Sequence, residues 1–362
     1  MTDNKNPIQI PEEKKKRFSI STSTKIVIGM MVALVILLFP LSDYYIEVPG
    51  TTENVAPMVK VDGKNNDKEE GGFYLTTVQI GKANLAGMIR SKLSPFADIY
   101  TAKELMGTSS NEDYNRMSMF YMENAQNMAI YQAFKLANKP FDLQYKGVYV
   151  LEVTDDSTFK NELHVADTLT KVNGKDFKSS KELIDYVGGQ KVGDEVKITF
   201  LDSGQEKEAT GKIIKLKNGK NGIGISLVDR TEVKSTPEVT IDAGAIGGPS
   251  AGLMFTLETY EQITGENLRN NRQIAGTGTI ENDGSVGRIG GIDKKIATAS
   301  KSGAKIFFAP DDEITSDMKK ADPKIKSNYQ EALDAAKKLK TDMKIIPVKN
   351  VEDALKYLKE NR

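Results

Sequence analysis

A serine and a lysine stand in two glycine-rich segments whose combined chemistry could hydrolyse an acyl bond. Ser250 follows the loop AGAIGGP and opens an apolar run typical of a buried helix. A serine at a helix N-terminus lies beside backbone amides with partial positive charge, which suits a developing oxyanion. Lys295 falls in the first turn of a second expected helix, an unfavourable place for a cation. A neutral lysine there could accept the serine proton.

The scarce residue types exclude other chemistries. The chain has no cysteine, which removes thiol nucleophiles, disulfides and cysteine-bound metals together. Its single histidine, His164, cannot supply an H-E-x-x-H zinc site. His164 stands in a polar stretch away from any serine in a tight glycine turn, so we interpret it as a surface or half-buried residue. The sequence therefore predicts no metal, no cofactor, and a base other than histidine.

Length and charge limit the classes of partner. A chain of 362 residues suggests two or three domains, and its 39% hydrophobic and 28% charged residues are typical of globular proteins. Lys+Arg and Asp+Glu both number 50, so the basic excess of a nucleic-acid-binding protein is missing. The sequence contains no G-x-x-x-x-G-K-[ST] motif. We therefore expect neither nucleic acid nor ATP as a partner.

The N-terminal segment predicts a membrane anchor. Residues 26–41 carry no charge and are nearly all apolar, and the basic cluster KKKR at 14–17 precedes them. With residues 19–24 and 44–46 added, the run reaches the roughly 20 residues that cross a bilayer as a helix. No small-x-small cleavage pattern follows, which favours an uncleaved anchor over a removed signal peptide. Because basic clusters mark the cytoplasmic side, we expect a single-pass cell-membrane protein with everything after about Ile46 extracellular.

A β-rich segment between residues 143 and 228 is predicted to bind peptides. Short strands alternate there with glycine-containing turns and one helical stretch, SSKELIDYVGG. In that order the segments resemble a PDZ domain. The resemblance implies that an extended peptide adds to a sheet edge and that Gly147, Val148 and Tyr149 belong to the loop that holds its terminal carboxylate. A β-rich packing domain without a ligand is the alternative.

The two glycine-rich segments together resemble the proteolytic domain of Lon peptidases. The nucleophile motif of that family is matched by Gly248, Pro249, Ser250, Ala251 and Gly252. The base motif is matched by the pair Gly290 and Gly291 followed by Lys295, which stands 45 positions after Ser250.

This resemblance implies a role for each matched residue. Lys295 would deprotonate Ser250, and Thr277, in the strand AGTGTI, would hydrogen-bond the lysine amine. The backbone around Gly248, Pro249 and Ala251 would hold the oxyanion. The expected activity is that of a serine peptidase with a Ser-Lys dyad.

Gly247 departs from the pattern of Lon enzymes that use ATP, which usually have aspartate at this position. The glycine, the anchor and the PDZ-like segment look like the membrane-anchored Lon-like peptidases of the SepM type, which cut peptide pheromones. In that type the PDZ domain interrupts the protease domain. The resemblance implies an α/β (α+β) Lon-type fold with these parts: a cytoplasmic tail (1–24), a transmembrane anchor (25–46), the first part of the protease domain (47–142), a PDZ-like domain (143–228) and the catalytic domain (229–362).

The sequence thus predicts an ATP-independent serine endopeptidase that cleaves extracellular peptides and matures a secreted signalling peptide. Two other functions stay open. An inactive scaffold or chaperone would retain only PDZ binding, and a general cell-surface quality-control protease would cut many unfolded chains. Lon-like domains commonly assemble as rings, so a homo-oligomer is also open.

Overall fold

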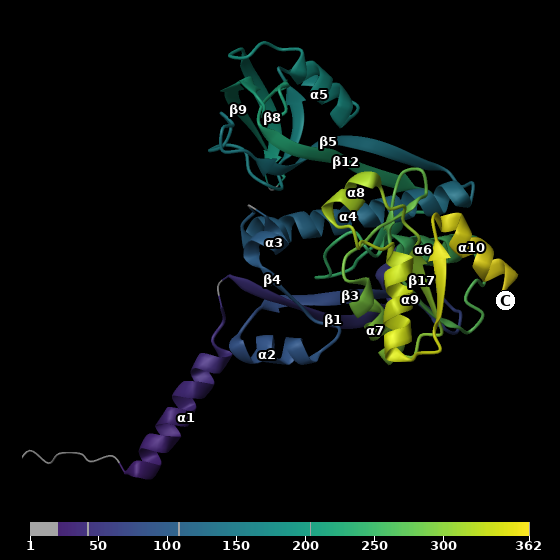
Figure 1. Ribbon diagram of the computed structural model, residues 1–362. Helices are drawn as coiled ribbons and strands as arrows, with labels where there is room; N and C mark the ends of the chain where they lie inside the picture. The colour runs from purple at the N-terminus through teal and green to yellow at the C-terminus, as the bar shows by residue number, and fades with distance from the viewer. Residues whose placement is uncertain (1–20, 42, 108, 203, 362) are drawn as a thin grey trace, which may run out of the picture.

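The computed structural model describes residues 21–41, 43–107, 109–202 and 204–361. They form a larger unit built on one mixed sheet, a smaller β-rich unit, and an N-terminal helix that projects away from both (Figure 1). The basic cluster at 14–17 lies outside the described residues.

The N-terminal helix α1, Thr22–Leu38, is exposed along its whole length. It begins at Ser21, whose side chain accepts a hydrogen bond from the Thr24 N–H at 3.2 Å. Phe39 is extended, because a residue before proline is pushed out of the helical region. Within the described ranges, no helix combines the length and the hydropathy of a membrane span.

The predicted extension of this helix through residues 44–46 is wrong. These residues open strand β1, Tyr44–Asn54, and Tyr45 is only 6% exposed. The backbone of Tyr45 pairs with both neighbouring strands of the sheet, so it belongs to the folded unit and not to the apolar helix.

The larger sheet joins segments from both sides of the β-rich unit. Its strand order is β18-β17-β14-β3-β1-β4. Besides β1, the strands are β3 (Gly72–Lys82), β4 (Asp98–Thr101), β14 (Gln273–Gly276), β17 (Ile306–Pro310) and β18 (Lys344–Val348). Strand β3 runs parallel to β14 and antiparallel to β1, so residues far apart in sequence share one core.

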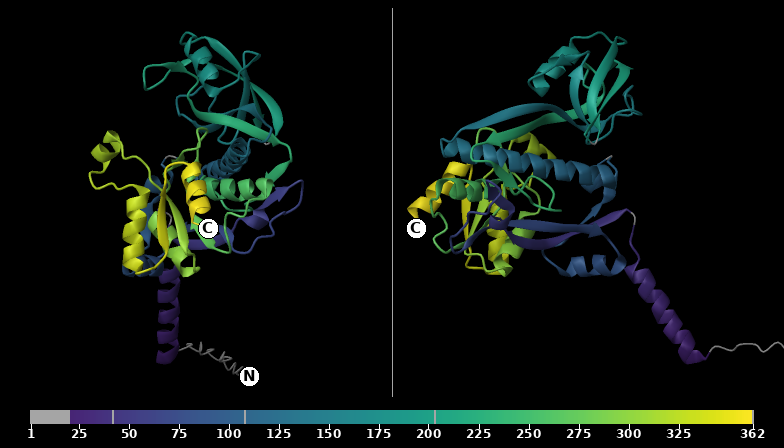
Figure 2. Two further views of the ribbon diagram at one scale, coloured as in Figure 1. Left: turned by 90° about the vertical axis from the view of Figure 1, so that its right-hand side faces the viewer. Right: turned by 180° about the vertical axis from the view of Figure 1, so that it is seen from behind.

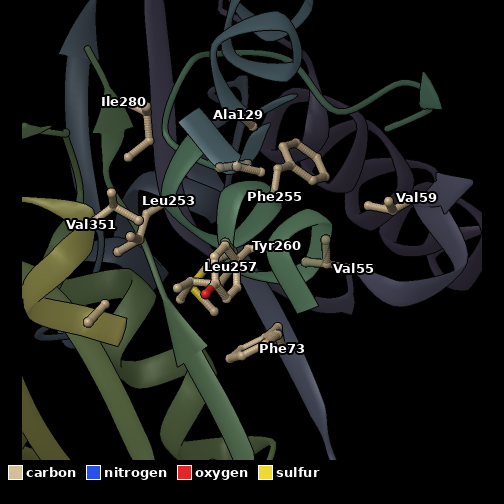
Figure 3. Packing of buried hydrophobic residues seen from close by; sticks show 14 of the residues in the cluster. Val55, Val59, Phe73, Ala129, Leu253, Phe255, Leu257, Tyr260, Ile280 and Val351 are labelled. Atoms are coloured by element: carbon tan, nitrogen blue, oxygen red, sulfur yellow. The ribbon is translucent and has the colours of Figure 1, made fainter. Parts of the chain in front are cut away.

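Alternating side chains of this sheet pack into two different helical layers. Phe73 and Phe308 belong to the core under α4 (Asn111–Leu136) and α6 (Gly252–Thr264), part of which Figure 3 shows. Phe307 belongs to the opposite core with α7 (Ile292–Lys301) and α9 (Asn328–Leu339). Shorter elements complete the unit: β2 (Val59–Val61), α2 (Leu85–Leu93), α3 (Ala102–Met106), β13 (Val239–Ile241), β15 (Thr279–Ile280), β16 (Val286–Gly287), α8 (Ser316–Ala321), α10 (Val351–Glu360) and a 3₁₀ turn (Ala56–Met58).

The smaller unit has a hydrophobic core of its own, whose buried residues run from Val148 to Ile223. Its main sheet has the order β12-β5-β6-β8-β9, with β7 attached to β6. The elements are β5 (Phe141–Val153), β6 (Thr168–Val172), β7 (Lys175–Asp176), α5 (Ser180–Gly188), β8 (Glu195–Asp202), β9 (Gln205–Lys212), β10 (Ile214–Lys215), β11 (Asn221–Gly222) and β12 (Ile225–Ser235). The long antiparallel pair β5 and β12 connects it to the larger unit (Figures 1 and 2).

The smaller unit rests on helix α4. The ring of Tyr149 stacks on Phe120 with centroids 3.6 Å apart, and the Tyr149 hydroxyl donates to the Arg116 carbonyl at 3.2 Å. An ion pair of 3.1 Å joins Arg230 to Glu123. Helix α4 therefore links the two units, and Phe120 is part of the packing between them.

A buried ionic cluster lies beside the second half of α6. The guanidinium of Arg269 is fully buried and pairs with Asp67 and with Glu261 at 2.7 Å, while Glu258 lies 3.9 Å away. Three carboxylates thus face one cation in a medium of low dielectric. Burial raises the pKa of Glu258 to about 7, against the opposing charge of Arg269.

Replacing Glu258 by glutamine should remove part of the pH dependence of folding stability. The pKa of Glu258 in the folded protein lies above its unfolded value near ~4.3. The contribution of protonated Glu258 to folding stability is therefore fully present below the unfolded pKa and is lost as pH rises through about 7. In urea unfolding, the free energy of unfolding of Glu258→Gln should rise relative to that of the wild type between pH 5 and 8. The difference should reach about 2–3 kcal/mol at the upper end of this range. The exposed Glu352→Gln is the control, and an offset that does not change with pH would contradict the assignment.

Candidate active site

The backbone of Ser250 is fixed by bonds from two directions. Before it, Gly248 adopts a φ of 86°, a left-handed conformation that favours glycine, and its N–H donates to the Ser118 carbonyl of α4 at 2.7 Å. The carbonyl of Ser250 itself accepts from the Gly278 N–H at 2.8 Å and from the Thr277 hydroxyl at 3.0 Å. The serine is therefore held between α4 and the segment that follows β14, just before α6 begins.

Lys295 meets this serine from helix α7. Its Nζ lies 2.7 Å from the Ser250 Oγ and 3.1 Å from the Thr277 Oγ1, and the residue is only 3% exposed. Burial lowers the pKa of Lys295 to about 7, although the charge of Glu47 acts in the opposite direction. A substantial fraction of the amine is therefore neutral at physiological pH.

The neighbouring Lys294 shows why the pKa of Lys295 is lowered. It is as deeply buried, at 1% exposed, but its Nζ bonds to Asp98 and to Asp293 at 3.2 Å. Burial alone would lower the pKa of Lys294, yet these carboxylates outweigh it and raise the pKa above the usual value. Lys295 bonds only to hydroxyls among the described residues, so nothing in direct contact compensates a positive charge.

The hydrogen bonds around Lys295 indicate which group can donate a proton and which can accept one. The Thr277 hydroxyl donates to the Ser250 carbonyl, so its oxygen accepts an N–H from Lys295. A neutral amine has two N–H groups and one lone pair. With one N–H on Thr277, the lone pair can accept the hydroxyl proton of Ser250.

The segment predicted to hold the oxyanion contains residues that cannot donate to it and residues that can. The N–H of Gly248 already donates to Ser118, and Pro249 has no N–H, so neither can bind an oxyanion. The N–H groups of Ser250 and Ala251 bond to no acceptor among the described residues, and they lie at the N-terminal end of α6. These two amides are suited to a developing negative charge.

A cavity of about 530 Å³ opens beside the serine and the lysine. Its other walls include residues 75–80 of β3, Met122 of α4, and Gly50, Thr51 and Glu53 of β1. Strand β14 pairs with β3 only as far as Leu75, so beyond it this edge of β3 has no partner strand in the described part of the chain. An extended peptide could add to such an edge.

The predicted carboxylate-binding loop is not a loop, and this prediction is wrong. Gly147, Val148 and Tyr149 lie inside strand β5, paired with β12 on one edge, and Val148 and Tyr149 pair with β6 on the other. A peptide can add only to an edge strand, and β12 is an edge that contacts helix α5. The sequence signal that could have located this edge is the glycine-rich run NGIGIS, residues 221–226, which leads into β12.

His164 lies in the smaller unit, as expected of a surface residue. Its side chain is 59% exposed, and its Nδ1 lies 3.9 Å from a carboxylate oxygen of Asp167. It takes no part in the arrangement around Ser250.

Two known families match parts of the chain, and the matched ranges overlap at residues 207–213. Residues 126–213 match the PDZ domain, and residues 207–360 match the Lon protease (S16) C-terminal proteolytic domain. The Lon protease of Metamycoplasma arthritidis is 32% identical over 34% of this chain, and that of Rickettsia bellii is 31% identical over 33%. The chain spans 13% of the length of each of these relatives.

Solved structures of PDZ domains are also similar to part of this chain. The PDZ domain of an SdrC-like protein from Listeria monocytogenes is 45% identical, with 23% of this chain and 90% of that chain covered, at a TM-score of 0.22.

The loop before Ser250 should depend on a glycine at position 247. A Cβ added there would lie 2.3 Å from the Ser118 Oγ and 3.2 Å from the Ser118 Cβ, so Gly247→Ala must displace the Ser118 side chain, the loop or α4. We expect at least a tenfold loss in hydrolysis of a small ester. Ser118→Gly removes the clashing atoms and should restore most of the rate in the double variant, which a double-mutant cycle would quantify. Full activity of Gly247→Ala alone would show that the loop adapts freely.

Proposed function

Because the chain combines a PDZ domain with a Lon-type proteolytic domain, we propose that it is a membrane-anchored serine endopeptidase that cleaves extracellular peptides without ATP. The observation that carries the proposal is the 2.7 Å contact between Ser250 and a buried lysine without a carboxylate partner. An inactive scaffold would have no use for a lysine whose pKa is lowered to about 7 beside a serine hydroxyl.

The mechanism follows from the protonation states. Neutral Lys295 takes the proton of the Ser250 hydroxyl as the oxygen attacks the peptide carbonyl. The N–H groups of Ser250 and Ala251 stabilise the oxyanion. Charged Lys295 then protonates the leaving amine, and water, deprotonated by the same lysine, releases the acyl group and regenerates Ser250. Thr277 orients the amine throughout.

Two features support an extended peptide as the substrate. The cavity beside Ser250 includes the strand edge of β3 that lacks a partner, which could align a peptide backbone with the nucleophile. The edge strand β12 beside α5 offers a second place for strand addition, and it replaces the predicted segment 147–149 as the proposed PDZ contact. Independence from ATP is supported by the missing Walker sequence and by Gly247.

Attachment to a membrane is supported by α1. Its long run of apolar side chains is exposed, although the helix contacts α2. A helix of 17 residues is about 26 Å long, close to the roughly 30 Å of a hydrocarbon core. With the basic cluster of residues 14–17 on the cytoplasmic side, the catalytic unit would lie outside the cell.

The dyad is tested by Lys295→Arg. Arginine keeps the charge and most of the length but cannot release its proton at any usable pH, so this variant should be as inactive as Ser250→Ala. Lys294→Arg is the matched control, because it changes the adjacent, equally buried lysine and preserves a cation for Asp98 and Asp293. It should retain most of the peptide hydrolysis.

The same experiment includes a pH profile of the wild type. Because the base must be neutral and its pKa is lowered to about 7, the rate should rise with pH along a limb centred near 7. Near-normal cleavage by folded Lys295→Arg would rule out a Ser-Lys mechanism.

We further propose that the physiological substrate is a secreted signalling peptide, on the strength of the resemblance to peptidases that process pheromones. Mass spectrometry of the culture medium should then show one or a few peptides that are processed by cells with the wild type and remain uncut with Ser250→Ala. Differences in many unrelated protein fragments would instead identify a general quality-control protease.

A further inference from the structure

Helix α2 exposes three of its four large apolar side chains, whereas Met88 is half-buried and the one buried residue is the small Ser91. Leu85 is 41% exposed, Ile89 59% and Leu93 83%. The side facing the sheet has little bulk: Ser91 is 6% exposed, and a Cβ at Gly87 would lie 2.8 Å from the Ile46 side chain. This is the reverse of a helix that only covers a sheet, which directs its apolar face inward.

The exposed side chains form one stripe with basic flanks. Leu85, Ile89 and Leu93 are spaced by four residues, which places them along one face of the helix. At 100° per residue, Lys92 borders this stripe on one side and Arg90 on the other, and α2 contains no acidic residue. An apolar stripe between cations is typical of a helix that lies at a membrane interface, where the cations reach the phosphate groups.

The position of α2 identifies the membrane as the partner. The Leu41 N–H, just after α1, donates to the Ala83 carbonyl at 2.7 Å, and the Ala83 N–H donates to the Tyr44 carbonyl at 2.8 Å. The start of α2 is therefore tied to the point where the apolar helix enters the folded unit. The views of Figures 1 and 2 show α2 on the side of the larger unit from which α1 projects.

We propose that α2 lies in the interfacial layer of the bilayer, with its apolar stripe among the acyl chains and its two cations at anionic headgroups. This inference rests on the proposed membrane attachment through α1. A second contact beside the anchor would fix the orientation of the larger unit, and hence the height and direction of the cleft that contains Ser250.

The absence of native cysteine allows a direct test with single labels. Ile89→Cys, carrying an environment-sensitive fluorophore, is reconstituted as the full chain into phosphatidylcholine–phosphatidylglycerol vesicles with nitroxide-labelled lipids. Its emission should shift to the blue and be quenched at least twofold by nitroxides near the headgroup. Val32→Cys on α1 should be quenched by nitroxides at the bilayer centre. Lys319→Cys on the exposed α8 should be affected by neither.

The outcomes separate this inference from the proposals on which it rests. Quenching at Val32 without quenching at Ile89 would overturn the role of α2 and leave the anchor intact. No quenching at either position would overturn both. Blue-shifted emission from the label at position 89 that lipid nitroxides do not quench would mean that protein, such as a second copy of this chain, covers the stripe.

The two cations are tested by Arg90→Gln/Lys92→Gln. In this variant, quenching of the label at position 89 should decrease in anionic vesicles and stay unchanged in purely zwitterionic ones. Peptide hydrolysis, measured separately in detergent, reports on the dyad alone.

Discussion

The chemistry proposed for this protein depends on a lysine that is buried without a counter-ion in direct contact. A charge removed from water is unfavourable unless an opposite charge or several hydrogen bonds compensate it, and Lys295 bonds only to the hydroxyls of Ser250 and Thr277. The next residue, Lys294, is equally buried but bonded to carboxylates, so it remains charged. One turn of helix therefore contains a structural cation and the proposed base, and the two lysines differ in the groups that surround each amine.

Maintaining this environment requires segments from distant parts of the chain. Glu47 and Asp98, which pair with Lys294, come from strands that precede the β-rich unit, whereas both lysines and the serine follow it. Helix α4, also before that unit, supplies the Ser118 carbonyl that fixes the loop of Ser250. The catalytic unit is thus complete only when the two parts on either side of the PDZ domain share one sheet.

The placement of the PDZ domain follows from the same topology. Strands β5 and β12 enter and leave it as an antiparallel pair, and Tyr149 stacks on Phe120 of α4. The helix on which the PDZ domain packs therefore also contacts the loop that precedes Ser250. A peptide bound at β12 would lie on a unit with direct packing contact to the active-site support, and α2 would set the distance of both from a membrane.

The sequence by itself singled out the residues whose roles depend on local chain chemistry. Glycine-rich loops leading into helices marked Ser250 and Lys295, and the resemblance to Lon peptidases pointed to Thr277, which the structure places between β14 and β15. The structure brings these three side chains within hydrogen-bonding distance. The tertiary structure decided what depends on neighbours that are distant in sequence. The lowered pKa of Lys295 is a property of burial, which no local pattern specifies. The resemblance to a PDZ domain implied that residues 147–149 belong to a loop, but strands paired on both edges make them the interior of a sheet. Whether a strand is an edge, and whether an amine has a carboxylate beside it, is determined only when the whole chain has folded.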